Sequence, residues 1–102
     1  MKRLGELPSR EIEHFGSHGF RHTRVALGEV QVSLVELDGL IGGHEAVSSQ
    51  LLLVVRGRVA AATRDERAEL GVGEAVSWQE GEWHETRSLE PSTTLIVEGK
   101  IE

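Results

Sequence analysis

The segment at residues 43–57 reads GHEAVSSQLLLVVRG, and the segment at residues 73–88 reads GEAVSWQEGEWHETRS. Each combines a short β-rich run with glycine turns, and neither shows the 3.6-residue period of a helix. Similar runs follow one another from residue 20 onward, with turn residues at spacings of about 8–12. This pattern predicts an all-β protein, either a sandwich or a barrel of antiparallel strands.

The strands can be outlined from their alternation of apolar and polar residues. We expect strands over residues 20–27, 30–34, 50–55, 58–63, 74–78, 83–88 and 93–97. Gly39, Gly42 and Gly43 are expected to interrupt the sheet, and Asp65-Glu66 marks a later turn. Arg56-Gly57 is interpreted as the turn of a hairpin between its two flanking strands.

The N-terminal segment, residues 1–19, has no clear period and is assigned to the same domain as the barrel of residues 20–102. It is expected to be irregular or partly helical. Ser9 is a candidate cap for one helical turn, with Glu11 and Glu13 near the positive end.

Composition limits the classes of function. A chain of 102 residues fits one domain. The net charge of −6 and the lack of a basic stripe argue against nucleic-acid binding. The absence of cysteine excludes disulfides, thiolate metal sites and a cysteine nucleophile, and it suits the cytoplasm. The longest apolar run, Leu51 to Val55, is too short to span a membrane, and no signal peptide is recognised.

The two quoted segments resemble the signature stretches of the cupin superfamily. In the first stretch, His44 stands at the first histidine position, Gln50 at the Glu/Gln position and Gly57 at the closing glycine. In the second, Gly73, Gly81 and His84 keep the family spacing, and Ser88 stands at the asparagine position. The resemblance covers nearly half of the chain. It implies a double-stranded β-helix, or jelly-roll, barrel with a pocket inside, and it leaves the activity open.

The resemblance also implies a metal site. In metal-binding cupins, these positions hold one divalent ion such as iron, manganese, nickel or zinc. Mapped onto this chain, the ligands are His44, Gln50 and His84, while Ala46 replaces the usual second histidine. A neutral amide donates less charge than a carboxylate, so affinity should be lower and the metal can be absent.

Strand parity suggests further pocket residues, because alternate residues of a strand share a face. Glu82 and Thr86 have the parity of His84. Glu82 is the candidate for an optional fourth metal ligand or for a hydrogen-bond partner of the ligands, and it is also the candidate catalytic acid or base. Ser48 has the parity of His44, and Trp78 that of the inward apolar row. Trp83 and Glu85 are expected on the outer face. His14, His18 and His22 are interpreted as lying outside the site.

Three functional classes remain open from the sequence. The first is a small-molecule binding module, with or without metal. The second is a metal-dependent enzyme of dioxygenase or isomerase type acting on a small polar organic molecule, with the metal polarising a bound oxygen. The third is a structural domain with a closed pocket. We expect a homodimer, because small cupins resembling this one pair edge strands.

Overall fold

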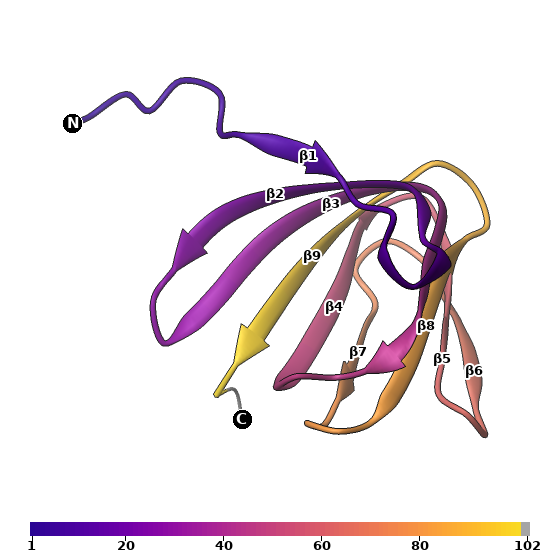
Figure 1. The fold of residues 1–102 in the computed structure, drawn as a ribbon. Helices are drawn as coiled ribbons and strands as arrows, with labels where there is room; N and C mark the ends of the chain where they lie inside the picture. The colour runs from indigo at the N-terminus through magenta and orange to yellow at the C-terminus, as the bar shows by residue number, and fades with distance from the viewer. Residues whose placement is uncertain (101–102) are drawn as a thin grey trace.

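The computed structural model describes residues 1–100, which form nine β-strands and one 3-10 turn. In chain order these are β1 (Ser9–Glu11), η1 (His14–Gly16), β2 (His18–Leu27), β3 (Val30–Glu45), β4 (Ser49–Arg56), β5 (Val59–Ala62), β6 (Arg67–Leu70), β7 (Ala75–Trp78), β8 (Trp83–Ser88) and β9 (Ser92–Gly99). Figure 1 shows the strands curling into a nearly closed antiparallel barrel, which confirms the predicted all-β jelly roll. No helix within the described residues is long or apolar enough to cross a membrane.

The long strand β3 joins the two halves of the barrel. The strand order is β6-β5-β8-β3-β9-β4-β7, with β2 also paired to β3 and β1 paired to β2. The first part of β3 pairs with β9 from Val30 to Leu37, and its last part pairs with β8 from Leu40 to Glu45. A single strand therefore contributes to both walls around the interior.

The core fills the barrel from the inward-facing rows of these strands. On β4, Gln50, Leu52 and Val54 are buried while their neighbours are more exposed, as expected for a strand with one face inward. Val35 and Val59 are completely buried. Each such side chain stabilises the fold by about 1.5–3 kcal/mol relative to its exposed state.

The predicted hairpin between residues 50–55 and 58–63 is wrong. Strand β4 pairs with β7 and β9, whereas β5 pairs with β6 and β8. The chain crosses between the barrel halves at Gly57, whose φ of +87° suits glycine. The Ser92 hydroxyl stabilises this corner through two contacts with Arg58. It accepts a hydrogen bond of 3.0 Å from the Arg58 N–H and is within donating distance, 2.9 Å, of the Arg58 carbonyl oxygen. Alternation identifies both strands but does not identify their partners.

Two expectations for the first half of the chain also need correction. Ser9 does not cap a helical turn, because Ser9–Glu11 pairs with β2 as an antiparallel strand. The helical turn lies further on, at η1. The glycines do not interrupt the sheet either, since β3 continues through them with an irregularity between Ile41 and His44. At Gly42 the missing side chain lets the Phe15 backbone approach β3, so this glycine serves close packing.

Candidate functional site

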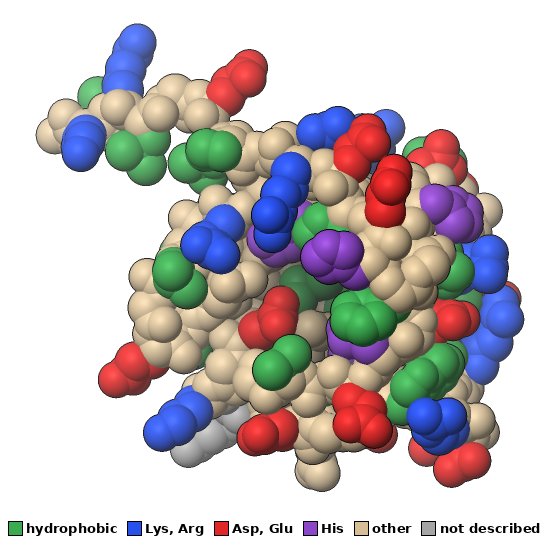
Figure 2. Space-filling model, in the orientation of Figure 1, with side chains coloured by type: hydrophobic (Ala, Val, Ile, Leu, Met, Phe, Trp, Pro, Cys, Tyr) green, Lys and Arg blue, Asp and Glu red, His purple; other side chains and the backbone are tan. Residues whose placement is uncertain are grey.

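A cavity of about 200 Å³ lies between the walls of the barrel. Its polar lining consists of His14, His22, His44 and His84 together with Gln50, Glu98, Ser17 and Thr86. Ile12, Phe15, Phe20, Ile41, Leu52 and Ile96 supply the apolar lining. Figure 2 shows histidine side chains gathered around a hollow on the face drawn there. The mixture of apolar walls with a few polar groups is typical of small-molecule sites.

Strand pairing brings the central polar residues together. His44 on β3 is the cross-strand partner of His84 on β8. Gln50 on β4 lies between Trp78 on β7 and Glu98 on β9, and it is paired with both. Because directly paired residues share a face of the sheet, these positions form two inward rows on opposite parts of the barrel.

The two central histidines are held in a defined tautomer by backbone carbonyls. The Nδ1 atom of His44 lies 2.9 Å from the Gly42 oxygen, and that of His84 lies 3.3 Å from the Glu82 oxygen. A carbonyl only accepts, so each Nδ1 carries the proton and each Nε2 keeps a lone pair. The hydrogen bonds of both rings to the protein are made through Nδ1, and neither Nε2 has a protein partner. Within residues 1–100 every buried side-chain polar atom does have a partner, so the two Nε2 atoms are not buried but face the cavity that both residues line.

Burial keeps two of the lining imidazoles neutral. It lowers the pKa of His84 below the ordinary value of 6.5, and the hydrogen bond to the Glu82 carbonyl offsets this only in part. Burial also lowers the pKa of His22, against an opposing effect of the Glu98 carboxylate. At neutral pH these rings are therefore hydrogen-bonding or ligating groups rather than cations.

Aromatic rings stack along one wall of the cavity. Phe15 lies nearly parallel to His44, with ring centroids 4.6 Å apart and an interplanar angle of 11°. The centroids of His44 and His84 are 4.4 Å apart, and Trp78 packs on the other side of His84 at 4.7 Å. The contacts fix the ring planes of both histidines, which leaves their Nε2 atoms in set positions.

The fold of this site is shared with several solved structures. A cupin-2 domain containing protein from Shewanella frigidimarina is 25% identical with a TM-score of 0.70, covering 78% of this chain and 79% of its own. An RmlC-like cupin from the same organism has a TM-score of 0.83 at 12% identity, covering 99% of this chain and 90% of its own. The chain is a small protein of the cupin fold. KdgF from Halomonas sp. matches this cupin with a TM-score of 0.82 at 21% identity, covering 98% of this chain and 94% of its own.

The amino-acid sequence of this cupin does not match a characterised family or protein. No protein-family model matches the chain, and no curated protein is similar to it in sequence. The likeness is therefore one of fold, and a shared fold does not determine the chemistry of the cavity.

Four of the residues that the sequence singled out meet in the cavity of this cupin. His44, Gln50, His84 and Thr86 all line it. Gln50 is 9% exposed and His84 only 2%. Trp78 does not line the cavity, but its ring packs directly against His84.

Two other candidate residues lie elsewhere. Glu82 lines a separate pocket of about 170 Å³ together with Trp78, and its carboxylate accepts a hydrogen bond of 3.1 Å from the Gln79 N–H. Ser48 lies in the bend between β3 and β4 and does not line the cavity. The assumption of an unbroken strand from His44 to Gln50 placed Ser48 inside, whereas the chain leaves the sheet after Glu45.

Three ionisable residues of the cavity were missed by the sequence analysis. His14 and His22 line the cavity, although they were interpreted as lying outside the site, and Glu98 was not singled out. A signal for Glu98 existed, because it continues the inward row of Thr94 and Ile96 on β9. The position of His14 depends on the fold of η1 over the cavity, which no period in the sequence indicates.

The donor set fits a divalent metal only in part. The three ligands expected from the sequence supply the Nε2 atoms of His44 and His84 and the Gln50 amide oxygen. In the described part of the chain, no three His, Cys, Asp or Glu side chains are close enough to hold a metal ion together. Ala46, which stands at the position of the family's second histidine, is 4% exposed and does not line the cavity. Water or a bound molecule would have to complete the coordination.

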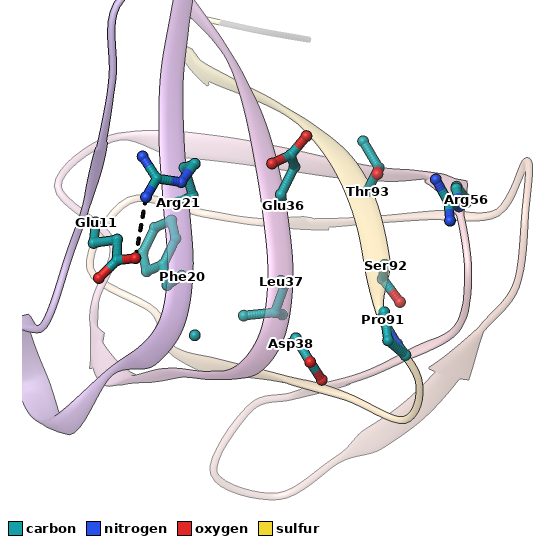
Figure 3. Close-up of a pocket in the computed structure, with 11 residues that line it drawn as sticks. Glu11, Phe20, Arg21, Glu36, Leu37, Asp38, Arg56, Pro91, Ser92 and Thr93 are labelled. Atoms are coloured by element: carbon teal, nitrogen blue, oxygen red, sulfur yellow. Dashed lines mark hydrogen bonds and ion pairs between the residues drawn. The ribbon is translucent and has the colours of Figure 1, made fainter.

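A second depression lies on the surface over β2, β3 and β9 and is larger, at about 320 Å³. Figure 3 shows its charged side chains around the opening, including Glu36, Asp38 and Arg56. The Arg21 guanidinium there pairs with Glu11 at 3.0 Å, and both side chains are largely exposed. Exposed charges of this kind bind ligands weakly, so the barrel cavity is the better candidate site.

Proposed function

We propose that this cupin binds a small polar organic molecule in the barrel cavity, with His44, Gln50 and His84 as its polar contacts. The observation that carries the proposal is the pair of Nε2 atoms left free by two backbone-anchored imidazoles. Gln50 adds an amide that both donates and accepts. Apolar side chains surround these groups, and surroundings of this kind strengthen each polar contact.

A binding screen tests this proposal. Metal-free protein labelled with ¹⁵N is titrated with small polar fragments, and the shifted backbone amides are mapped onto the chain. We expect shifts to cluster at His44, Gln50 and His84. His84→Gln and His44→Gln should weaken binding about tenfold, because each replaces a ring that a backbone carbonyl holds in place by a flexible amide whose oxygen is not fixed at the position of Nε2.

The matched control is His18→Gln, because His18 is exposed and does not line the cavity. This variant should bind like the unmodified protein. Shifts confined to the surface depression around Glu36 and Arg56, with the cavity unaffected, would contradict the proposal.

A divalent transition metal in the same cavity is the second candidate, favoured by the tautomers of the two histidines. Metal-bound imidazoles commonly donate their other N–H to a carbonyl, as His44 and His84 do. Iron, manganese, nickel and zinc suit two imidazoles and an amide oxygen, and such an ion would supply Lewis acidity to a bound oxygen.

Metal analysis of protein purified without a histidine tag tests the metal candidate. One equivalent of metal after reconstitution, lost in His84→Gln, would support it. Substoichiometric metal that does not rise on reconstitution would contradict it. Oxygen uptake or product formation with small acids and sugars would then distinguish an enzyme from a binding protein.

A further inference from the structure

The cavity contains one carboxylate, and neither a lysine nor an arginine stands beside it. Glu98 is the one Asp or Glu among the described lining residues, and no Lys or Arg lines the cavity. An anionic molecule entering the metal-free cavity would meet a negative charge without a compensating positive one. A cationic molecule would instead supply the missing charge.

Glu98 is placed to receive such a charge. It lies on β9 between Gln31 and Gln50, so both of its cross-strand neighbours are neutral amides. In residues 1–100 no side chain forms an ion pair with its carboxylate. The nearby His22 does not neutralise it, because burial lowers the pKa of that imidazole more than Glu98 raises it.

Aromatic rings form the wall that would contact the rest of the ligand. Phe15 is 65% exposed and stacks on His44, and both rings line the cavity. The face of an aromatic ring attracts cations, and it also packs against carbon chains or rings. A carboxylate and an aromatic face in one cavity together favour an organic ammonium ion over a neutral or acidic molecule.

We propose that the metal-free cavity binds a small organic amine in its ammonium form, with the ammonium group on Glu98 and the carbon portion against Phe15 and His44. This inference rests on the proposed function and names its ligand class. A cavity of about 200 Å³ has the volume of roughly seven water molecules. An amine with a similar number of non-hydrogen atoms therefore matches it in size.

Three small aromatic ligands of nearly equal shape but different charge show whether affinity depends on the charge of the ligand or on its size. Benzylamine, benzyl alcohol and benzoate are titrated into chelator-treated protein at pH 7.5, with affinity measured by calorimetry and the site mapped by NMR. Benzylamine should bind about tenfold more tightly than benzyl alcohol, as expected for a charge-assisted hydrogen bond in a partly buried site. Benzoate should bind most weakly.

Two isosteric variants test the role of the carboxylate. Glu98→Gln should abolish the preference for benzylamine while benzyl alcohol binds as before. Glu80→Gln is the control, because Glu80 is exposed in the turn before β8 and does not line the cavity. It should keep the full preference.

Preferred binding of benzoate or benzyl alcohol in the cavity would overturn the amine inference and leave the proposed function standing. A preference for benzylamine that survives Glu98→Gln would also overturn it. If none of the three probes binds in the cavity, the amine inference fails, and the fragment screen then decides separately on the proposed function.

Discussion

Two backbone carbonyls set the chemistry of the cavity at the scale of single residues. They hold the protons of His44 and His84 on Nδ1 and leave the opposite nitrogens free. The spacing of the sequence was sufficient to place His44, Gln50 and His84 together. It was not sufficient for Glu82, whose side chain is engaged by the turn at Gln79, or for His22, which reaches the cavity from β2.

The lowered pKa of His84 predicts a dependence of stability on pH. Its pKa is below 6.5 in the folded chain and near 6.5 in the unfolded chain, so the unfolded chain binds the proton first. The free energy of unfolding is therefore retained above pH 6.5 and falls as the pH drops from 6.5 towards the folded pKa. Urea unfolding at pH 7.5 and pH 5.5 measures this loss.

His84→Gln should reduce the loss of stability between these two pH values. Direct NMR titration of the His84 ring provides a second reading. A folded-state pKa at or above 6.5 would contradict the prediction.

The elements around η1 show how the cavity is covered. The Ser17 hydroxyl accepts a hydrogen bond of 2.9 Å from the Gly42 N–H, which ties the end of η1 to β3. This contact holds Phe15 over His44. Strand positions were predictable from alternation, whereas the crossing at Gly57 and the packing of η1 were not, because both depend on contacts between residues far apart in the chain.

Gly42→Ala should displace η1. A Cβ atom at this position would overlap the Phe15 carbonyl, and crowding of this kind costs about 1–3 kcal/mol. The thermal midpoint should fall by about 4 °C or more, and the ring protons of Phe15 should lose the shifts caused by stacking on His44.

Gly28→Ala is the control for this substitution, because a Cβ atom there meets nothing within 4 Å. Its thermal midpoint should stay close to that of the unmodified protein. Equal midpoints for both variants would show that η1 is not anchored at Gly42.

Packing between strands makes a separate prediction about the core. Leu37 on β3 is 2% exposed, so Leu37→Ala should lower the free energy of unfolding by about 2–5 kcal/mol. Leu4, near the start of the chain, is 68% exposed, and Leu4→Ala should change stability by less than about 0.5 kcal/mol. Denaturant unfolding compares the two, and a similar cost for both would contradict the described core.

The whole molecule has an edge suited to self-association. Strand β1 covers β2 only as far as Thr23, and the following part of β2 exposes Val25 and Leu27. An open strand edge with apolar side chains favours pairing with a second copy. The predicted homodimer remains a prediction, and we expect it to form through this edge.

Sedimentation at micromolar concentration should give the mass of two chains. Val25→Lys should shift the protein to monomer, because charge on an edge strand opposes pairing. Val72→Lys, at an exposed position away from this edge, should leave the dimer intact. A monomer for the unmodified protein would rule the dimer out.

The central claim is that the barrel cavity is a binding site built on two free imidazole nitrogens. Long-range ¹H–¹⁵N spectra of the histidine rings test it directly. Without ligand, His44 and His84 should both show a protonated Nδ1 and an unprotonated Nε2. On titration with the polar fragment that binds best in the screen, the Nε2 resonances of these two rings should shift while those of His18 stay fixed. Protonated Nε2 atoms in the free protein, or fragment binding that leaves both Nε2 resonances unchanged, would contradict the account.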